Sequence, residues 1–346
     1  MLKEHIYSLP KADLHCHLDG SLRISTILEL AKNQGVQLPV QNEKDLEDLL
    51  FVKDKVQNLE QYLQRFEITL SVMQTVESTQ RCTYELIEDA SRENIRYIEI
   101  RYCPILHTKD GLSMEDTVDA VKCGIDRGKR DFGTDSGIII CGIRDISPKI
   151  SLQLAEVAVA YKNRGVVGFD LAGIEENFPA KKHKEAFYLI HNNNINATIH
   201  AGEAYGPESI HQAIHYCNAN RIGHGTLLYK DRQLMNYVND HRIALEICLS
   251  SNIQTGSVKS IDIHPFKTYL DENLRVTLNT DNRLISNTTL TDEYLLAADT
   301  FKLNIEEITT IIINGFKSAF LPHNERRDMI RQVNKELQLA CNLTEK

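Results

Sequence analysis

The stretch Asp13-Leu14-His15-Cys16-His17-Leu18-Asp19-Gly20 decides the fold and the function that this sequence predicts. It is typical of a short strand that ends near Asp19, and side chains two positions apart in a strand point to the same face. His15 and His17 therefore project together and could hold a metal ion. A lone His-x-His pair is weak evidence, since it also fits an ordinary strand with two surface histidines. The distinction depends on whether distant parts of the chain supply further ligands.

The composition is that of an ordinary globular protein, with 346 residues of which 42% are hydrophobic and 25% charged. A net charge of −9 argues against nucleic acid as a partner. The chain has no apolar run long enough to span a membrane and no signal-peptide core, so we expect neither membrane insertion nor secretion. Its eight cysteines are scattered without a Cys-x-x-Cys pair, which favours reduced thiols. The sequence therefore predicts a cytoplasmic protein.

Short apolar runs recur along the chain, and longer segments with helical periodicity lie between them. Several runs are apolar at nearly every position, which is typical of parallel strands covered on both faces. Eight such units predict the α/β class and one closed (β/α)8 (TIM) barrel domain over residues 1–346. The expected strands are Lys11–His17, Ile95–Cys103, Gly137–Ile143, Val166–Leu171, Asn196–His200, Arg221–His224, Ile243–Cys248 and Arg275–Asn279.

One connection is much longer than the others. About 75 residues separate the first expected strand from the second, and residues 20–93 contain several helical patterns. Connections that follow the strands line the carboxyl face of a barrel, so these helices either pack on its outside or cover its mouth. We expect this insertion, at about 20–93, to form part of a lid over the active site.

Histidine and acidic residues follow several of the expected strands. In a barrel the carboxyl ends of all strands meet at one face, so ligands from different strands can surround one ion. Three imidazoles and a carboxylate suit zinc, and the absence of cysteine favours a catalytic site with an open position. These residues are His15, His17 and Asp19 after the first strand, Asp170 after the fourth, His200 and Glu203 after the fifth, His224 after the sixth, and Asp281 after the eighth.

Taken together, these motifs resemble the adenosine deaminase family, and the resemblance covers nearly the whole chain. It implies a metal-dependent barrel that hydrolyses the 6-amino group of adenosine and 2′-deoxyadenosine, giving inosine or deoxyinosine and ammonia, as in purine salvage. The motifs occur in the family's order and are residues 11–23, Asp170–Gly173, His200–Glu203, Arg221–Gly225 and Asn279–Asp281.

The resemblance also implies which residues carry the chemistry. His224 would orient the attacking water and help to take its proton. Glu203 would protonate purine N1, provided that burial keeps its carboxyl protonated. The zinc ion would make the water acidic enough to supply hydroxide at neutral pH. The implied ligands of one zinc ion per subunit are His15, His17, His200 and Asp281.

Substrate contacts follow from the same resemblance. The backbone N–H of Gly173 would donate to purine N3, and Asp19 would accept a hydrogen bond from the ribose 5′-hydroxyl. His17 is also expected among the substrate-binding residues. A carboxylate at Asp19 would repel a 5′-phosphate, so we expect a nucleoside substrate and no nucleotide. The residues that resemble the family's apolar gate over the ribose are Leu59, Tyr62 and Phe66.

One departure from the family pattern concerns the last motif. Many members have two aspartates and a proline where this chain has Asp281, Asn282 and Arg283. The second acidic position faces purine N7, which only accepts hydrogen bonds. Asn282 can donate there through its amide without first taking up a proton. The substitution is therefore compatible with the chemistry, and it leaves the exact substrate preference open.

Other functions fit parts of the sequence. The chain could be a relative of these deaminases that acts on adenine or on a 5′-modified adenosine. It could also be a catalytically inactive barrel that binds purines without converting them. A binuclear amidohydrolase would need a carboxylated lysine after the fourth strand, where Asp170–Gly173 contains none. The His-x-Glu and Pro-Cys-x-x-Cys signature of nucleic-acid deaminases is also absent from the sequence. The oligomeric state is left open.

Overall fold

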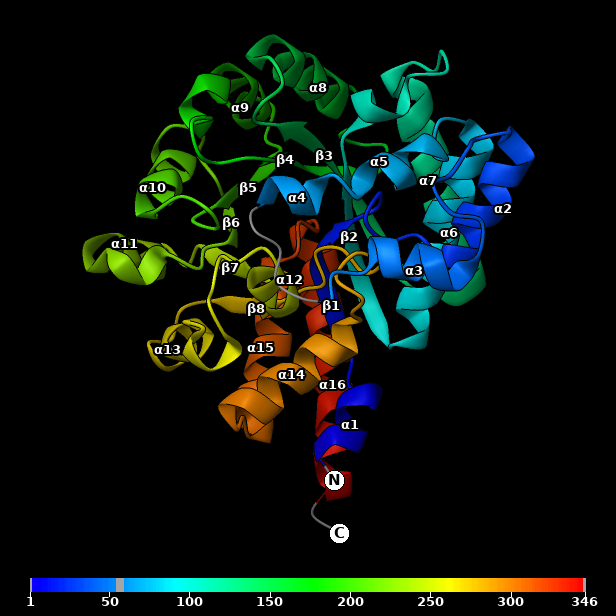
Figure 1. The fold of residues 1–346 in the computed structure, drawn as a ribbon. Helices are drawn as coiled ribbons and strands as arrows, with labels where there is room; N and C mark the ends of the chain where they lie inside the picture. Colours follow the sequence, from blue (N-terminus) through cyan, green and yellow to red (C-terminus); the bar gives the residue numbers. More distant parts are fainter. Residues whose placement is uncertain (1, 54–58, 345–346) are drawn as a thin grey trace.

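Eight parallel strands form one curled sheet in this computed structural model, which describes residues 2–53 and 59–344 (Figure 1). Each strand pairs with the next in chain order. The first and last strands meet through a bridge between Cys16 and Asp281. There the His17 N–H donates to the Asp281 carbonyl and the Asp281 N–H donates to the His15 carbonyl, both at 2.7 Å. The sheet therefore closes at the strand ends that carry the candidate ligands.

The strands agree with the sequence-based expectation. All eight predicted strands are present, with ends that differ by at most two residues, and the predicted (β/α)8 barrel is confirmed. The strands are β1 (Lys11–His17), β2 (Ile95–Tyr102), β3 (Asp135–Ile143), β4 (Val166–Ala172), β5 (Asn196–Ala201), β6 (Arg221–His224), β7 (Ala244–Ile247) and β8 (Val276–Leu278).

Helices surround the sheet on its outer side (Figure 1). The α-helices are α1 (Leu2–Ser8), α2 (Ile24–Gln34), α3 (Glu43–Leu50), α4 (Leu59–Leu63), α5 (Phe66–Ser71), α6 (Val76–Arg92), α7 (Met114–Phe132), α8 (Pro148–Ala160), α9 (Lys184–Asn192), α10 (Pro207–His215), α11 (Arg232–Asp240), α12 (Leu249–Gln254), α13 (Phe266–Asp271), α14 (Leu290–Phe301), α15 (Ile305–Ser318) and α16 (His323–Thr344). Short 3₁₀ turns are η1 (Pro104–His107), η2 (Ala180–His183), η3 (Leu228–Lys230) and η4 (Ile261–Ile263).

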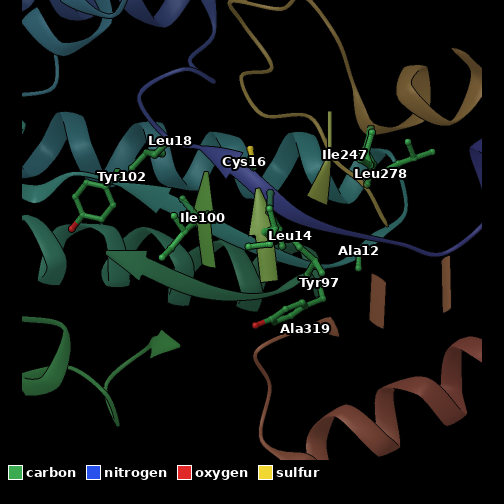
Figure 2. Packing of buried hydrophobic residues seen from close by; sticks show 14 of the residues in the cluster. Ala12, Leu14, Cys16, Leu18, Tyr97, Ile100, Tyr102, Ile247, Leu278 and Ala319 are labelled. Atoms are coloured by element: carbon green, nitrogen blue, oxygen red, sulfur yellow. The ribbon is translucent and has the colours of Figure 1, made fainter. Parts of the chain in front are cut away.

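The two faces of the barrel strands bury different side chains. Leu14, Ile100 and Leu278 are fully buried in the apolar core (Figure 2). Alternate positions carry charged groups that are also fully buried, such as Arg101 on β2 and Glu246 on β7. These two side chains contact each other although β2 and β7 are not neighbours in the sheet. Such a contact is only possible across the interior of the barrel, so the interior is polar near the candidate site.

The long connection after β1 holds α2 to α6, and two of these helices approach the carboxyl ends of the strands. Tyr62 of α4 and Phe66 of α5 line the cavity at this face. That these helices act as a lid, and that the chain is one domain, stay predictions. No helix in the described ranges is long and apolar enough to cross a membrane.

Candidate metal centre and active site

Four side chains from three parts of the barrel converge at the carboxyl ends of the strands. One ligand atom from each of His15, His17, His200 and Asp281 lies within 4.8 Å of all the others. The Nε2 atoms of His15 and His17 lie 3.0 and 3.2 Å from Nε2 of His200. The same two atoms lie 3.5 and 3.4 Å from Oδ1 of Asp281. The structure thus brings together all four predicted metal ligands.

Hydrogen bonds at Nδ1 of two imidazoles determine which ring nitrogen faces the cluster of four candidate ligands. His15 donates from Nδ1 to Glu246 Oε2 at 2.8 Å, and His200 donates from Nδ1 to Asp170 Oδ2 at 3.0 Å. A neutral imidazole with its proton on Nδ1 has a lone pair on Nε2. Two lone pairs that face each other at 3.0 Å repel unless a cation lies between them. Bonds of about 2.1 Å to a shared zinc ion would separate neighbouring ligands by roughly 3.0–3.4 Å, so the donor set fits zinc.

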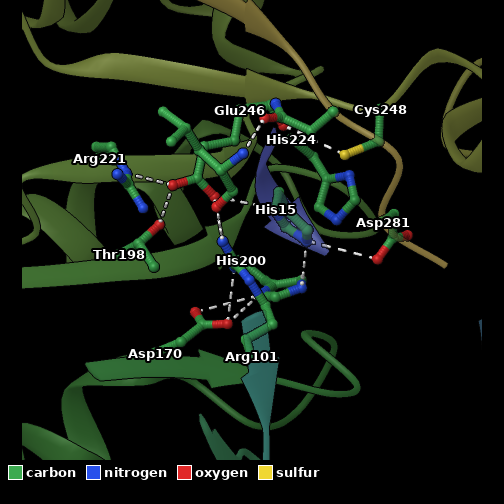
Figure 3. A network of polar contacts seen from close by, with 12 residues as sticks. His15, Arg101, Asp170, Thr198, His200, Arg221, His224, Glu246, Cys248 and Asp281 are labelled. Carbon is green, nitrogen blue, oxygen red and sulfur yellow. Dashed lines mark hydrogen bonds and ion pairs between the residues drawn. The ribbon is translucent and has the colours of Figure 1, made fainter. Parts of the chain in front are cut away.

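A buried ionic network holds the two supporting carboxylates (Figure 3). Arg101 donates to Asp170 Oδ2 at 3.0 Å and to Glu246 Oε2 at 2.9 Å. Burial alone would raise the pKa of Glu246, but Arg221 and Arg101 hold that pKa well below its usual range. The pKa of Asp170 is likewise held well below its usual range, because His200 and Arg101 outweigh the effect of burial. Both carboxylates are therefore ionised and accept hydrogen bonds from the ligand imidazoles.

Asp281 and His224 share an unusual backbone conformation. Both have φ of 61°, in the left-handed region that residues other than glycine rarely adopt. Ser251 donates to Asp281 Oδ2 at 2.6 Å, which leaves Oδ1 directed at the imidazoles. His224 is buried, and its ring packs against the rings of His15 and His200. The strained conformation directs each side chain from its strand end into the cluster.

A cavity of about 390 Å³ adjoins the four ligands, and its volume is in the range of small-molecule sites. Most of the predicted substrate and catalytic residues line it. Leu59 begins α4, and its side chain is not among those that the structure describes. The predicted residues that line the cavity are His17, Asp19, Tyr62, Phe66, Gly173, His200, Glu203, His224, Asp281 and Asn282.

Glu203 is a buried acid beside this cavity. Burial raises the pKa of Glu203 well above its usual range, and the Asp281 and Glu175 carboxylates raise it further. Burial and these two charges therefore favour the protonated form of its carboxyl group. His224 Nε2 lies 3.5 Å from Glu203 Oε2. A neutral acid and a neutral imidazole thus face the same cavity.

The loop that carries Glu203 is held from two sides. The buried Glu175 carboxylate accepts three hydrogen bonds, between 2.8 and 3.2 Å, from the N–H groups of residues 202–204. On the carbonyl side, Ser257 donates to Glu203 O at 2.6 Å and Thr226 donates to Gly202 O at 2.7 Å. Three consecutive N–H groups around one anion form a backbone nest. The loop's polar backbone groups are thereby satisfied, and the position of Glu203 is fixed.

Two buried acceptors at the cavity lack hydrogen-bond partners. Asp19 Oδ1 and Asn282 Oδ1 are both without a partner among the described residues. Asn282 donates from Nδ2 to Tyr62 Oη at 3.1 Å, which connects α4 to the end of β8. Unpaired buried acceptors are costly, so both atoms are suited to a donor from a ligand. Gly173 has φ of +92°, and a Cβ there would approach Asp145 to 3.1 Å, so the position requires glycine.

Sequence reasoning missed the residues that support the ligands. Glu246 was hidden within the apolar run Ile243–Cys248, and Glu175 lies in the loop after β4. Asn252 and His264, which support His224, lie in and beyond α12. A signal was present for Glu246, because a charged residue inside a strand that is buried on both faces needs a partner. No comparable signal marks the three residues outside the strands.

Comparisons with known proteins identify the family and the fold of this chain. The family model described as adenosine deaminase matches residues 10–336. An adenosine deaminase of Clostridium acetobutylicum is 41% identical, over 96% of this chain and 99% of its own. An N6-methyl-AMP deaminase of Arabidopsis thaliana is 26% identical, with a TM-score of 0.84 over 96% of this chain and 98% of its own. An adenine deaminase of Arthrobacter aurescens shares the fold, with a TM-score of 0.89 at 23% identity over 95% and 99% of the two chains.

The buried network predicts the effect of neutralising Glu246. Glu246→Gln leaves Arg101 and Arg221 with one counterion fewer inside the barrel, so we expect the free energy of unfolding to fall by about 3–5 kcal/mol. The affinity for zinc should fall roughly 10- to 100-fold, because His15 loses the acceptor that directs its ring. Denaturant unfolding and competition with a zinc chelator measure the two effects.

Glu272→Gln is the matched control, since Glu272 pairs with Arg232 on the surface. We expect this control to leave both the unfolding midpoint and the zinc affinity unchanged. A Glu246→Gln protein with the stability and zinc affinity of the original chain would contradict the supporting role of the network.

Proposed function

The chain belongs to the adenosine deaminase family, and from this premise we propose that it is a zinc-dependent hydrolase of adenosine and 2′-deoxyadenosine. The products are inosine or deoxyinosine and ammonia. The single observation that carries the proposal is the convergence of His15, His17, His200 and Asp281 beside a cavity that also holds the protonated Glu203. An ion site next to a buried acid suits the addition of water to an aromatic amidine.

We propose His15, His17, His200 and Asp281 as the ligands of one zinc ion per subunit. Imidazole and carboxylate ligands without cysteine suit a catalytic zinc site. When bound, the ion supplies a nucleophile at neutral pH by lowering the pKa of water to about 7. The supporting carboxylates of Asp170 and Glu246 keep the Nε2 lone pairs directed at the ion.

The chain's own residues move and hold protons around the purine. Glu203 donates its proton to N1 while water adds to C6, so the ring accepts electrons without building up a negative charge. His224 holds the attacking water through a hydrogen bond. One proton of the added water returns to the Glu203 carboxylate and the other passes to the amino group, so the C6–N bond breaks, ammonia leaves and the 6-oxo product forms. The nest around Glu175 fixes Glu203 for this transfer.

The substrate is a nucleoside. We propose that Asp19 accepts a hydrogen bond from the 5′-hydroxyl, with His17 beside it, and that Gly173 N–H donates to N3. Of the described residues that line the cavity, five are acidic and none is Lys or Arg. A 5′-phosphate would therefore find no cationic side chain to pair with in this cavity. The name of the Arabidopsis relative specifies a nucleotide substrate, whereas we propose a nucleoside substrate for this chain.

The apolar side of the cavity contacts the sugar. We propose that Leu59, Tyr62 and Phe66 form a gate that covers the ribose, as part of a lid contributed by residues 20–93. Asn282 donates its remaining amide N–H to purine N7. The hydrogen bond from Asn282 to Tyr62 supports this arrangement, because it couples the gate to the purine contact.

We further propose that the chain is a cytoplasmic enzyme of purine salvage. This location is supported by its seven described cysteines, all of which are free.

The role of Glu203 is tested by removing its proton donor. Glu203→Gln keeps the shape of the side chain but cannot transfer a proton, so kcat for adenosine should fall by about 10²–10⁴-fold or more while zinc stays bound. Steady-state kinetics and metal analysis measure the two quantities. Full activity in the zinc-loaded variant would rule out Glu203 as the proton donor to purine N1.

The role of Asp19 is tested from both sides of its hydrogen bond. Asp19→Ala should raise KM for adenosine about 2- to 10-fold, since burial raises the pKa of Asp19 to about 7 and a hydrogen bond to a group that is not fully ionised contributes about 0.5–1.5 kcal/mol. Adenosine 5′-monophosphate should be a poor substrate of the original enzyme. The control is 5′-deoxyadenosine, which lacks the hydroxyl and should show similar KM values with Asp19 and with Ala. If Asp19→Ala raised KM equally for adenosine and for 5′-deoxyadenosine, this result would contradict a hydrogen bond between the carboxylate and the 5′-hydroxyl.

The proton of Glu203 also predicts a pH dependence. Four charged or titratable groups face Glu203: the Asp281 and Glu175 carboxylates, Arg144, and His224. The negative charge of Glu175 raises the pKa of Glu203, so Glu175→Gln lowers it and the carboxyl loses its proton at a lower pH. The alkaline limb of kcat/KM should therefore move to lower pH.

Glu176→Gln is the control for this shift, because Glu176 is the exposed neighbour of Glu175. It removes the same charge without touching the nest, so its pH profile should match that of the original enzyme. An alkaline limb that stays in place in Glu175→Gln would contradict the coupling between the two acids.

A further inference from the structure

A chain of buried hydrogen bonds connects a backbone amide to His224. The N–H of Phe266 donates to His264 Nδ1 at 3.0 Å. His264 Nε2 lies 3.2 Å from Asn252 Oδ1, and Asn252 Nδ2 lies 2.9 Å from His224 Nδ1. Asn252, His264 and His224 are all buried. The last nitrogen of the series, Nε2 of His224, faces the cavity and Glu203.

The direction of every bond in this chain follows from its first member. A backbone amide can only donate, so His264 Nδ1 is an acceptor and the single proton of its neutral ring lies on Nε2. That proton requires an oxygen acceptor, which fixes the orientation of the Asn252 amide. The Asn252 Nδ2 group then donates to His224 Nδ1. The proton of the neutral His224 ring must therefore lie on Nε2.

Both rings are neutral in this environment. Burial lowers the pKa of His264 to about 3. In His224, Nδ1 accepts the hydrogen bond from the Asn252 amide and so carries no proton, which means that the ring is not the doubly protonated imidazolium. The reasoning from donors and acceptors therefore applies to neutral imidazoles.

We propose that His264 and Asn252 are positioning residues that hold His224 in the Nε2–H tautomer, so that His224 donates a hydrogen bond to the attacking water. This inference rests on the proposed function and deepens it. From the family resemblance we expected His224 also to help take the water's proton. A ring with its proton on Nε2 has no lone pair on the side that faces the cavity, so His224 orients the water and stabilises developing negative charge on its oxygen.

The structure also points to the substitution that reverses the tautomer. In Asn252→Asp, a carboxylate replaces the amide and can accept hydrogen bonds from both histidines. The proton of His224 then moves to Nδ1, and Nε2 presents a lone pair to the water. The substitution changes neither the size of the side chain nor any proposed metal ligand.

Neutron diffraction from deuterated crystals of the zinc-loaded enzyme locates these protons directly. We expect deuterium on Nε2 of His224 and of His264, and none on Nδ1 of either ring. Deuterium on Nδ1 of His224, alone or together with Nε2, would overturn the inference. This result is independent of turnover, so an enzyme without activity on adenosine would contradict the proposed function and leave the tautomer measurement valid.

The kinetics of variants provide a second test of the inference. Asn252→Asp should lower kcat by about 10²-fold or more at full zinc occupancy, with KM within a factor of a few, because His224 no longer donates to the water. Asn218→Asp is the control for the added charge, since Asn218 is exposed, and it should behave as the original enzyme. An Asn252→Asp enzyme that is folded and zinc-loaded with unchanged kcat would overturn the inference.

Discussion

The hydrogen bonds from two ligand imidazoles to buried carboxylates are the constraint on which the site depends. His15 pairs with Glu246 and His200 pairs with Asp170, and Arg101 donates to the same oxygen atom of each carboxylate. Two ionised carboxylates inside a barrel would be costly by themselves, and the guanidinium offsets that cost by pairing with both. The carboxylates in turn set the tautomers, so the Nε2 lone pairs converge. Buried arginines thereby hold the two carboxylates that direct His15 and His200, two of the proposed metal ligands.

Hydrogen bonds from the supporting residues specify the role of each group at the cavity. Carboxylates behind His15 and His200 place the proton on Nδ1 and leave Nε2 free to bind a cation. An amide behind His224 has the opposite effect and places the proton on Nε2. Glu175 adds a negative charge near Glu203, which keeps the acid protonated. Three imidazoles of the same chemical type thus perform two different tasks because their partners differ.

The sequence predicted the barrel well because several of its strands are nearly continuous apolar runs, each followed by a segment with helical periodicity. The convergence of His15, His17, His200 and Asp281 was also predictable, since each stands at or near the end of an expected strand and matches a family motif. Glu246 and Arg101 were overlooked because periodicity describes which face is buried and gives no information on a partner across the barrel. Asn252 and His264 were not predictable, because their roles depend on the direction of hydrogen bonds between segments that only the fold brings together. Whether α4 and α5 move over the substrate stays a prediction.

The central claim is that the four converging ligands hold a zinc ion that the deamination of adenosine requires. The most direct test follows the ultraviolet absorbance change as adenosine becomes inosine, in three samples of one preparation: as purified, after complete removal of metal, and after addition of one equivalent of zinc. The account predicts turnover in the first sample, none in the second, and recovery in the third. Turnover that persists without metal, or a fully zinc-loaded protein that leaves adenosine unchanged, would contradict it.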